Sequence, residues 1–135
     1  MFDLNSFLTP PKTIAVVGLS DKPERPSYQV ASYLQQQGFK IVPVNPTLVE
    51  VLGEKAYPSL LAIPAEIQLD IVDVFRQPEA VMAMVDEIIT SGRRPLVWLQ
   101  EGVISEMAKT KAEAVGLTVV MNQCLMKVHR AKMSK

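Results

Sequence analysis

Residues 13–28 constrain the fold of this chain more than any other stretch, because an apolar run, a glycine and a polar loop follow one another there. Residues 14–17 form a short apolar segment rich in β-branched side chains, which is typical of a parallel strand buried on both faces. Gly18 ends this run, a polar loop follows, and a helical pattern begins at Ser27, a plausible N-cap. The order predicts a strand that turns directly into a helix.

The loop after Gly18 has the composition of an anion site. It carries Ser20, Lys22 and Arg25, and the helix that follows adds backbone N–H groups and the positive end of a helix dipole. A sharp turn with solvated charges is the alternative. The two cations before a helix start favour a phosphate site. The dinucleotide fingerprint Gly-x-Gly-x-x-Gly is absent, because Ser20 and Pro23 stand where its second and third glycines belong.

Four further segments have the composition of strands, and most of them are followed by a helical pattern. The expected strands are residues 39–44, 71–75, 95–100 and 117–121. The expected helices are residues 27–38, 78–92 and 105–116, with Ser105 as an N-cap, a basic tail at 125–132, and single turns at 3–8 and 59–63. This alternation predicts an α/β fold: a Rossmann-like, doubly wound, parallel five-stranded sheet with helices on both faces, in one domain spanning residues 1–135.

The charge balance and the cysteine count exclude several classes of protein. Fourteen basic and fourteen acidic residues give no net charge, so we expect no nucleic-acid or membrane partner. A single cysteine rules out an internal disulfide. The chain has no apolar run long enough to span a membrane and no basic-plus-apolar N-terminal segment, so we expect a cytoplasmic protein.

Ligands of doubly wound sheets bind outside the carboxyl ends of the strands, where the winding reverses. The loop after the second expected strand, residues 44–46, lacks the acid that NAD-binding domains use to hold the ribose hydroxyls. It is either an ordinary turn, or it walls an adenine or leaves room for a ribose phosphate. In the later loops, Arg76 is equally suited to a phosphate or to a surface acid, and Trp98 fits the core better than a ligand platform.

The sequence shows little of the chemistry of catalysis. Cys124 lies near the same edge of the sheet, but no histidine or basic residue is adjacent to activate it. His129 is expected to be a surface or packing residue rather than a base. No metal cluster, Ser-His-Asp set or carboxylate pair is apparent, so binding is expected rather than catalysis.

Several blocks of the chain resemble one known family. They are Ile14-Ala-Val-Val-Gly-Leu-Ser20, Lys22-Pro-Glu-Arg-Pro-Ser-Tyr28, Val42-Pro-Val-Asn-Pro46, Gly53-Glu-Lys-Ala-Tyr-Pro58, Asp70-Ile-Val-Asp-Val-Phe-Arg76, Val97-Trp-Leu-Gln100 and Cys124. Together they resemble the small stand-alone CoA-binding proteins, which are similar to the CoA-binding domain of the succinyl-CoA synthetase α-subunit. The match covers nearly the whole chain in order.

The resemblance implies a Rossmann-like fold with coenzyme A (CoA) or an acyl-CoA across the strand ends. It assigns Gly18, Leu19, Ser20, Lys22 and Arg25 to the phosphates, Ser27 and Tyr28 to positions behind them, Val44, Asn45 and Pro46 to the adenosine, Val74, Phe75 and Arg76 to the next stretch, and Trp98, Leu99 and Gln100 to the pantetheine path. Two departures are visible, since the family commonly has Asp at Asn122 and Glu at Val128.

Three hypotheses for function follow. The first is a non-catalytic CoA or acyl-CoA binding module that acts as a carrier, sensor or partner subunit. The second is an NAD(P)-binding regulatory or redox domain, which the missing acid after the second strand disfavours. The third is a redox device in which Cys124 forms a mixed disulfide with CoA. A homodimer or an unidentified protein partner stays open.

Overall fold

The sheet of this protein contains five parallel strands. A computed structural model describes residues 8–9 and 12–133 of the chain. The sheet strands are β1 (Thr13–Val17), β2 (Lys40–Val44), β5 (Ile71–Val74), β6 (Leu96–Leu99) and β7 (Val119–Met121). Their order is β2-β1-β5-β6-β7, and all neighbours run parallel. The predicted α/β class and the five expected strands are confirmed.

The winding of the sheet reverses between β1 and β5. From β1 the chain passes through helix α2 (Pro26–Gln36) outward to β2, and it then returns across β1 to form β5. Ile14 in β1 pairs with Ile41 on one side and with Ile71 on the other. Loops after β1 and β5 therefore diverge toward opposite faces and leave space at the carboxyl edge.

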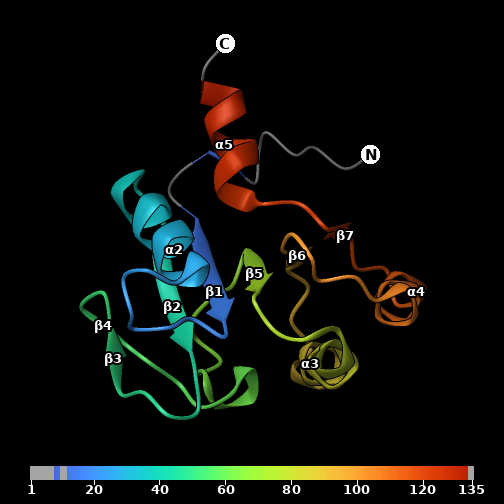
Figure 1. Cartoon of the computed structure of the whole chain (residues 1–135). Helices are drawn as coiled ribbons and strands as arrows, with labels where there is room; N and C mark the ends of the chain where they lie inside the picture. Colours follow the sequence, from blue (N-terminus) through green and yellow to red (C-terminus); the bar gives the residue numbers. More distant parts are fainter. Residues whose placement is uncertain (1–7, 10–11, 134–135) are drawn as a thin grey trace.

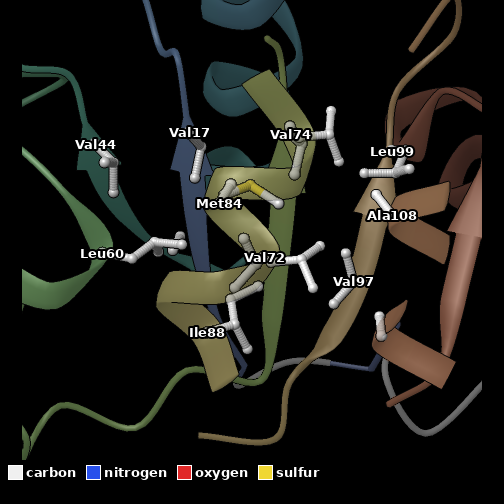
Figure 2. Packing of buried hydrophobic residues seen from close by; sticks show 14 of the residues in the cluster. Val17, Val44, Leu60, Val72, Val74, Met84, Ile88, Val97, Leu99 and Ala108 are labelled. Carbon is white, nitrogen blue, oxygen red and sulfur yellow. The ribbon is translucent and has the colours of Figure 1, made fainter. Parts of the chain in front are cut away.

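One face of the sheet packs against α3 (Pro78–Ser91), α4 (Glu106–Ala114) and the short 3-10 helix η1 (Leu60–Ala62). Figure 2 shows Met84 and Ile88 of α3 facing the valines of the strands, among them Val72 and Val74. These side chains are 5% exposed or less. Each such aliphatic side chain contributes about 1.5–3 kcal/mol when fully buried, so this layer fixes where α3 begins.

The opposite face packs against α2 and the C-terminal helix α5 (Leu125–Met133) (Figure 1). Trp98, Leu34 and Leu125 are fully buried in this layer. His129 is also buried, and its Nδ1 lies 2.7 Å from the hydroxyl oxygen of Tyr33. The sequence suggested that His129 is a surface or packing residue, and its burial shows that it is a packing residue. The contact joins α5 to α2.

A small hairpin between β2 and η1 was not expected from the sequence. Strands β3 (Glu50–Val51) and β4 (Glu54–Lys55) pair antiparallel across a turn formed by Leu52 and Gly53. Both turn residues have positive φ values, 55° and 77°. Such turns usually carry Asn-Gly or Asp-Gly, so leucine at the first position conceals the signal.

The predicted helix caps have different outcomes. The hydroxyl of Ser105 accepts the Ala108 N–H at 3.2 Å, which confirms Ser105 as the N-cap of α4. Ser27 is not the N-cap of α2, and this expectation was wrong. The cap residue is Arg25, because Pro26 occupies the first helical position, for which its fixed φ suits it.

Two further expectations concern the N-terminal helical turn and membrane-spanning helices. The helical turn expected at residues 3–8 lies, apart from Leu8, outside the described residues. Leu8 itself is buried in the layer that contains α2 and α5. None of the described helices is long and apolar enough to cross a membrane.

Candidate functional site

A cavity of about 700 Å³ opens at the carboxyl edge of the sheet. Its walls come from the loops after β1, β5, β6 and β7 and from the first turns of α2 and α5. This position beside the reversal point is where doubly wound sheets hold ligands, and the volume lies in the range of small-molecule sites.

Seven of the sixteen sequence-predicted site residues line this cavity. They are Gly18, Ser20, Arg25, Ser27, Phe75, Arg76 and Gln100. Four others, Leu19, Val74, Trp98 and Leu99, are fully buried in the two core layers. Lys22, Tyr28 and Asn45 line neither this cavity nor the smaller one described below.

Backbone contacts fix the β1–α2 loop (residues 18–25) against its neighbours. The N–H of Gly18 donates to the Val44 carbonyl at 2.8 Å. Gly18 has φ +86°, and a Cβ at this position would collide with the Phe75 carbonyl oxygen. Only glycine therefore lets the loop after β1 lie directly on the loop after β5.

Two serine hydroxyls in the cavity wall are oriented by backbone donors. Ser27 Oγ accepts the Ser20 N–H at 3.0 Å, and Ser20 Oγ accepts the Lys22 N–H at 3.0 Å. Each hydroxyl keeps its own hydrogen, for which the described residues offer no acceptor. Both serines can therefore donate to an anion in the cavity.

Two helices that begin at this cavity, α2 and α3, have no side-chain cap, whereas α4 and η1, which begin elsewhere, are capped. Neither Arg25 before α2 nor Gln77 before α3 makes a side-chain cap. Ser105 and Ser59, which line no part of the large cavity, cap α4 and η1. The Ala80 N–H of α3 donates to the Gln77 carbonyl at 2.9 Å. Other first-turn N–H groups of α2 and α3 are left for an external acceptor, and both helix dipoles place positive potential there.

Two arginine side chains in the wall have no partner. Arg25 and Arg76 line the cavity, and neither side chain forms a hydrogen bond or ion pair within residues 8–9 and 12–133. Arg76 also lines the second cavity. Guanidinium groups bind phosphate through two parallel hydrogen bonds. The arrangement can neutralise a diphosphate-sized anion.

A second cavity of about 160 Å³ lies on the other side of Arg76. Val44 and Pro46, both predicted adenosine contacts, line it together with Met84 of α3. Glu87 is also in this wall, but its carboxylate accepts the N–H groups of Leu60 and Leu61 at 3.1 and 3.4 Å. This second cavity is small, and Arg76 lines both it and the larger cavity.

Two asparagines in the strand-end loops have structural roles. Asn45 Nδ2 donates to the Leu19 carbonyl at 3.0 Å, while its Oδ1 accepts from both the N–H and the hydroxyl of Thr47. Asn122 Oδ1 accepts the Gly102 N–H at 2.8 Å. An aspartate carboxylate, which the resembled proteins commonly have at this position, would accept the Gly102 N–H equally well. Asn122 therefore keeps this hydrogen bond.

The cavity also has wall residues that the sequence did not single out. They are Pro26, Gln29, Val30, Gln77, Pro78, Glu101, Gly102, Val103, Met126 and Lys127, with Cys124 among the residues weighed earlier. Glu101 and Gly102 directly follow Gln100, so their position was accessible from the strand-end rule. Met126 and Lys127 reach the cavity only because α5 docks beside α2. Their sequence carries no local sign of that docking.

No group of three or more His, Cys, Asp or Glu residues within the described part of the chain could hold a metal ion. Lys127 and Glu101 face one another at 3.1 Å in the wall. The wall therefore combines the arginines and serine hydroxyls of the β1–α2 and β5–α3 loops with apolar side chains such as Val103 and Met126.

Comparison with known proteins identifies similar chains. A family model described as CoA binding domain matches residues 12–130. The uncharacterized protein YneT of Bacillus subtilis is 40% identical over 127 residues, which are 94% of this chain and 92% of that protein. A hypothetical protein from Pyrococcus horikoshii has 40% identity and a TM-score of 0.89, with 96% of this chain and 89% of that chain covered.

A larger protein shares one segment. The acetate–CoA ligase [ADP-forming] II of Archaeoglobus fulgidus is 42% identical over 66 residues, which make up 47% of this chain. The matched segment is only 10% of that ligase. The similarity therefore concerns one part of a much longer protein.

Proposed function

The chain belongs to the CoA binding domain family, and from this premise we propose that its large cavity binds coenzyme A or a short acyl-CoA. We propose further that the protein acts without catalysis, as a carrier, sensor or partner module. Cys124 is the thiol in the cavity wall, no histidine is among the described lining residues, and Lys127 is paired with Glu101.

The observation that carries the proposal is the concentration of unused donors around one space. Two uncapped helix starts, the unpaired arginines Arg25 and Arg76, and the hydroxyls of Ser20 and Ser27 all border the cavity. Ser27 is buried and Ser20 is half-buried, and such donors without acceptors destabilise a protein unless a ligand or water satisfies them, whereas Arg25 and Arg76 are exposed. A ligand with several phosphate oxygens fits this set.

The two cavities match the parts of CoA. CoA has a diphosphate, a ribose 3′-phosphate, an adenine and an uncharged arm with two amides. The proposal places the phosphates near Arg25 and Arg76, the adenosine toward Val44 and Pro46, and the arm toward the apolar side of the large cavity.

An NAD(P) ligand fits less well. Dinucleotide-binding domains hold the ribose hydroxyls with an acid after the second strand. Here no carboxylate from residues 45–49 lines either cavity, and Asn45 is occupied by Leu19 and Thr47. The 3′-phosphate of CoA needs no such acid.

Calorimetric titration of the purified protein tests the proposal. We expect CoA to bind at micromolar concentration, 3′-dephospho-CoA to bind more weakly, and NADH to bind weakly or not at all. Equal affinity for CoA and 3′-dephospho-CoA would remove the role of the 3′-phosphate. No binding of CoA would refute the function.

Charge-removing variants locate the phosphates. Arg25→Ala and Arg76→Ala are each expected to weaken CoA binding about tenfold, because charge-assisted hydrogen bonds are strong but these side chains are exposed, and solvent screens them. Lys40→Ala is the matched control, since Lys40 is exposed at the opposite end of β2. Unchanged CoA affinity in the double arginine variant would refute the placement. Lys22→Ala tests the sequence prediction for Lys22, whose side chain lines neither cavity.

A further inference from the structure

Gln100 and Ser27 are the uncharged polar residues of the large cavity wall that are almost completely buried, and of these two Gln100 is the one that carries an amide. It follows β6 directly and is 5% exposed, yet it contributes to the cavity wall. Its backbone is fixed on both sides, since its N–H donates to the Val74 carbonyl at 3.3 Å and its own carbonyl accepts the Val103 N–H at 2.9 Å. The side chain therefore starts from a rigid position.

The orientation of the Gln100 amide is determined by its partner. Its Oε1 accepts the N–H of Leu125, the first residue of α5, at 3.0 Å in a buried hydrogen bond. A flipped amide would place NH₂ against this N–H donor, so the contact identifies which atom is oxygen. The Nε2 group must point away from α5.

The Nε2 group has two N–H bonds and no acceptor among the described residues. It differs from the carboxylate oxygens of Asp73, which are sealed from solvent as well as unpartnered. The open space that Gln100 borders is the large cavity. Binding sites typically place a few fixed polar groups in a mainly apolar wall to orient the ligand, and Gln100 has this form.

The surroundings of Gln100 favour an uncharged acceptor. Val103 after β6, Cys124 after β7 and Met126 in α5 line the same cavity. The nearby charges of Glu101 and Lys127 are paired with each other at 3.1 and 3.2 Å. The unpaired arginines belong to the loops after β1 and β5, which leaves the loops after β6 and β7 for the uncharged part of a ligand.

The geometry points to Gln100 as a specificity residue whose Nε2 donates a hydrogen bond to a carbonyl oxygen of the ligand's uncharged arm. This inference rests on the proposed CoA function. The carbonyl is either an amide of the pantetheine arm or the thioester of an acyl-CoA. A ligand without a carbonyl at this point would leave the donor unsatisfied, and it would bind more weakly.

Gln100→Glu tests the inference, because it keeps an oxygen for the Leu125 N–H and replaces the donor by a second acceptor. Calorimetry compares CoA, acetyl-CoA and 3′-phosphoadenosine 5′-diphosphate, which retains the phosphates and lacks the arm. We expect the variant to weaken CoA or acetyl-CoA about three- to tenfold more than it weakens the armless nucleotide. Equal loss for all three ligands overturns the inference.

The control is Gln77→Glu, which adds the same charge to the wall at an exposed glutamine. It is expected to weaken all three ligands by a common factor. If Gln100→Glu does not fold, as judged by circular dichroism, the uncharged variant Gln100→Leu provides the same comparison between ligands.

Comparison of the three ligands also distinguishes a pantetheine amide from an acyl thioester as the bound carbonyl. It separates the role of Gln100 from the proposed CoA function. Equal extra loss for CoA and acetyl-CoA assigns an amide, while extra loss for acetyl-CoA alone assigns the thioester, and both support the inference. Failure of the unmodified protein to bind any of the three overturns the proposed function together with it. Normal binding with an unchanged ligand preference in the variant overturns only the role of Gln100.

Discussion

Gly18 lies so close to the backbone of Phe75 that a Cβ on Gly18 would collide with the Phe75 carbonyl oxygen. The same Cβ would lie 3.1 Å from both the Phe75 carbonyl carbon and the Arg76 Cδ. The loops after β1 and after β5, which are distant in sequence, thus contact each other closely because Gly18 has no side chain. Ser20 and Arg76, which follow these two contact points in the chain, both line the cavity.

Gly18→Ala is therefore expected to destabilise the protein and to weaken CoA. The positive φ alone costs about 1–2 kcal/mol for a non-glycine residue, and displacement of the Phe75 backbone adds to it. Gly53→Ala is the control, because Gly53 has φ +77° and no atom within 4 Å of its added Cβ. Urea unfolding and calorimetry measure both effects. Equal stability losses in the two variants would show that the Phe75 contact is unimportant.

The buried carboxyl of Asp73 predicts a pH dependence of stability. Asp73 lies in β5, and neither of its carboxylate oxygens has a partner with hydrogen-bond geometry. Desolvation raises its pKa well above the ordinary 3.8, and the nearby backbone N–H of Val74 opposes only part of the shift. The folded state therefore binds a proton more tightly than the unfolded state. Stability is highest below the unfolded pKa and falls as pH rises toward the folded pKa, by at most about 1.4 kcal/mol per pH unit.

Asp73→Asn removes this titration. The variant is expected to be more stable than the unmodified protein near pH 7, with a difference that shrinks as pH approaches 4. Urea unfolding from pH 4 to 8 measures it. Asp21→Asn is the control at an exposed carboxylate of the β1–α2 loop. A stability difference for Asp73→Asn that is constant with pH would contradict the expectation.

The strands were predictable because their signal is local. Residues 14–17 are buried on both faces and form the continuous aliphatic run that such a strand needs, and residues 71–74 are equally buried and aliphatic except for Asp73. The β3–β4 hairpin has only two residues in each strand, too few to show alternation. Its turn also begins with Leu52, a residue that rarely adopts positive φ.

The cavity wall was predictable where it follows a strand directly. Arg25, Arg76 and Gln100 lie in strand-end loops, and the reversal rule collects these loops at one edge. Lys127 reaches the wall through the docking of α5, which depends on residues of α2. Lys22 lies in the correct loop, but its side chain is outside the wall, because sequence spacing does not set side-chain direction.

The hydrogen bond between Tyr33 and His129 is expected to hold α5 in place. Burial and then the charge of Lys132 lower the pKa of His129 from its ordinary 6.5, which favours the neutral ring that accepts from the Tyr33 hydroxyl. Phe39 and Arg130 add contacts, the guanidinium lying 4.9 Å from the Tyr33 ring centroid. The bond therefore sits within a packed cluster.

Tyr33→Phe removes that hydrogen bond and leaves the shape of the aromatic ring unchanged. We expect a loss of about 1–2 kcal/mol in unfolding free energy and weaker CoA binding, since α5 carries Met126 and Lys127 to the cavity. Tyr28→Phe is the stability control in the same helix, because its hydroxyl has no partner among the described residues. Equal stability of both variants would exclude a role for the bond.

Glu101 is the acidic residue of the large cavity, and its removal is expected to strengthen CoA binding. Lys127 Nζ donates to both carboxylate oxygens of Glu101, at 3.1 and 3.2 Å, so Glu101 neutralises the charge of Lys127 in the unmodified protein. Glu101→Gln removes a repulsive charge from the wall and releases Lys127 for the ligand. Exposed ion pairs contribute about 0–1 kcal/mol to folding, so stability is expected to change little.

Calorimetry is expected to show CoA affinity increased about two- to fivefold at low salt, with a smaller gain at high salt because exposed charges are screened. Lys127→Gln in the Glu101→Gln background is expected to cancel much of that gain, and a gain that persists in the double variant would mean that Lys127 does not reach the ligand.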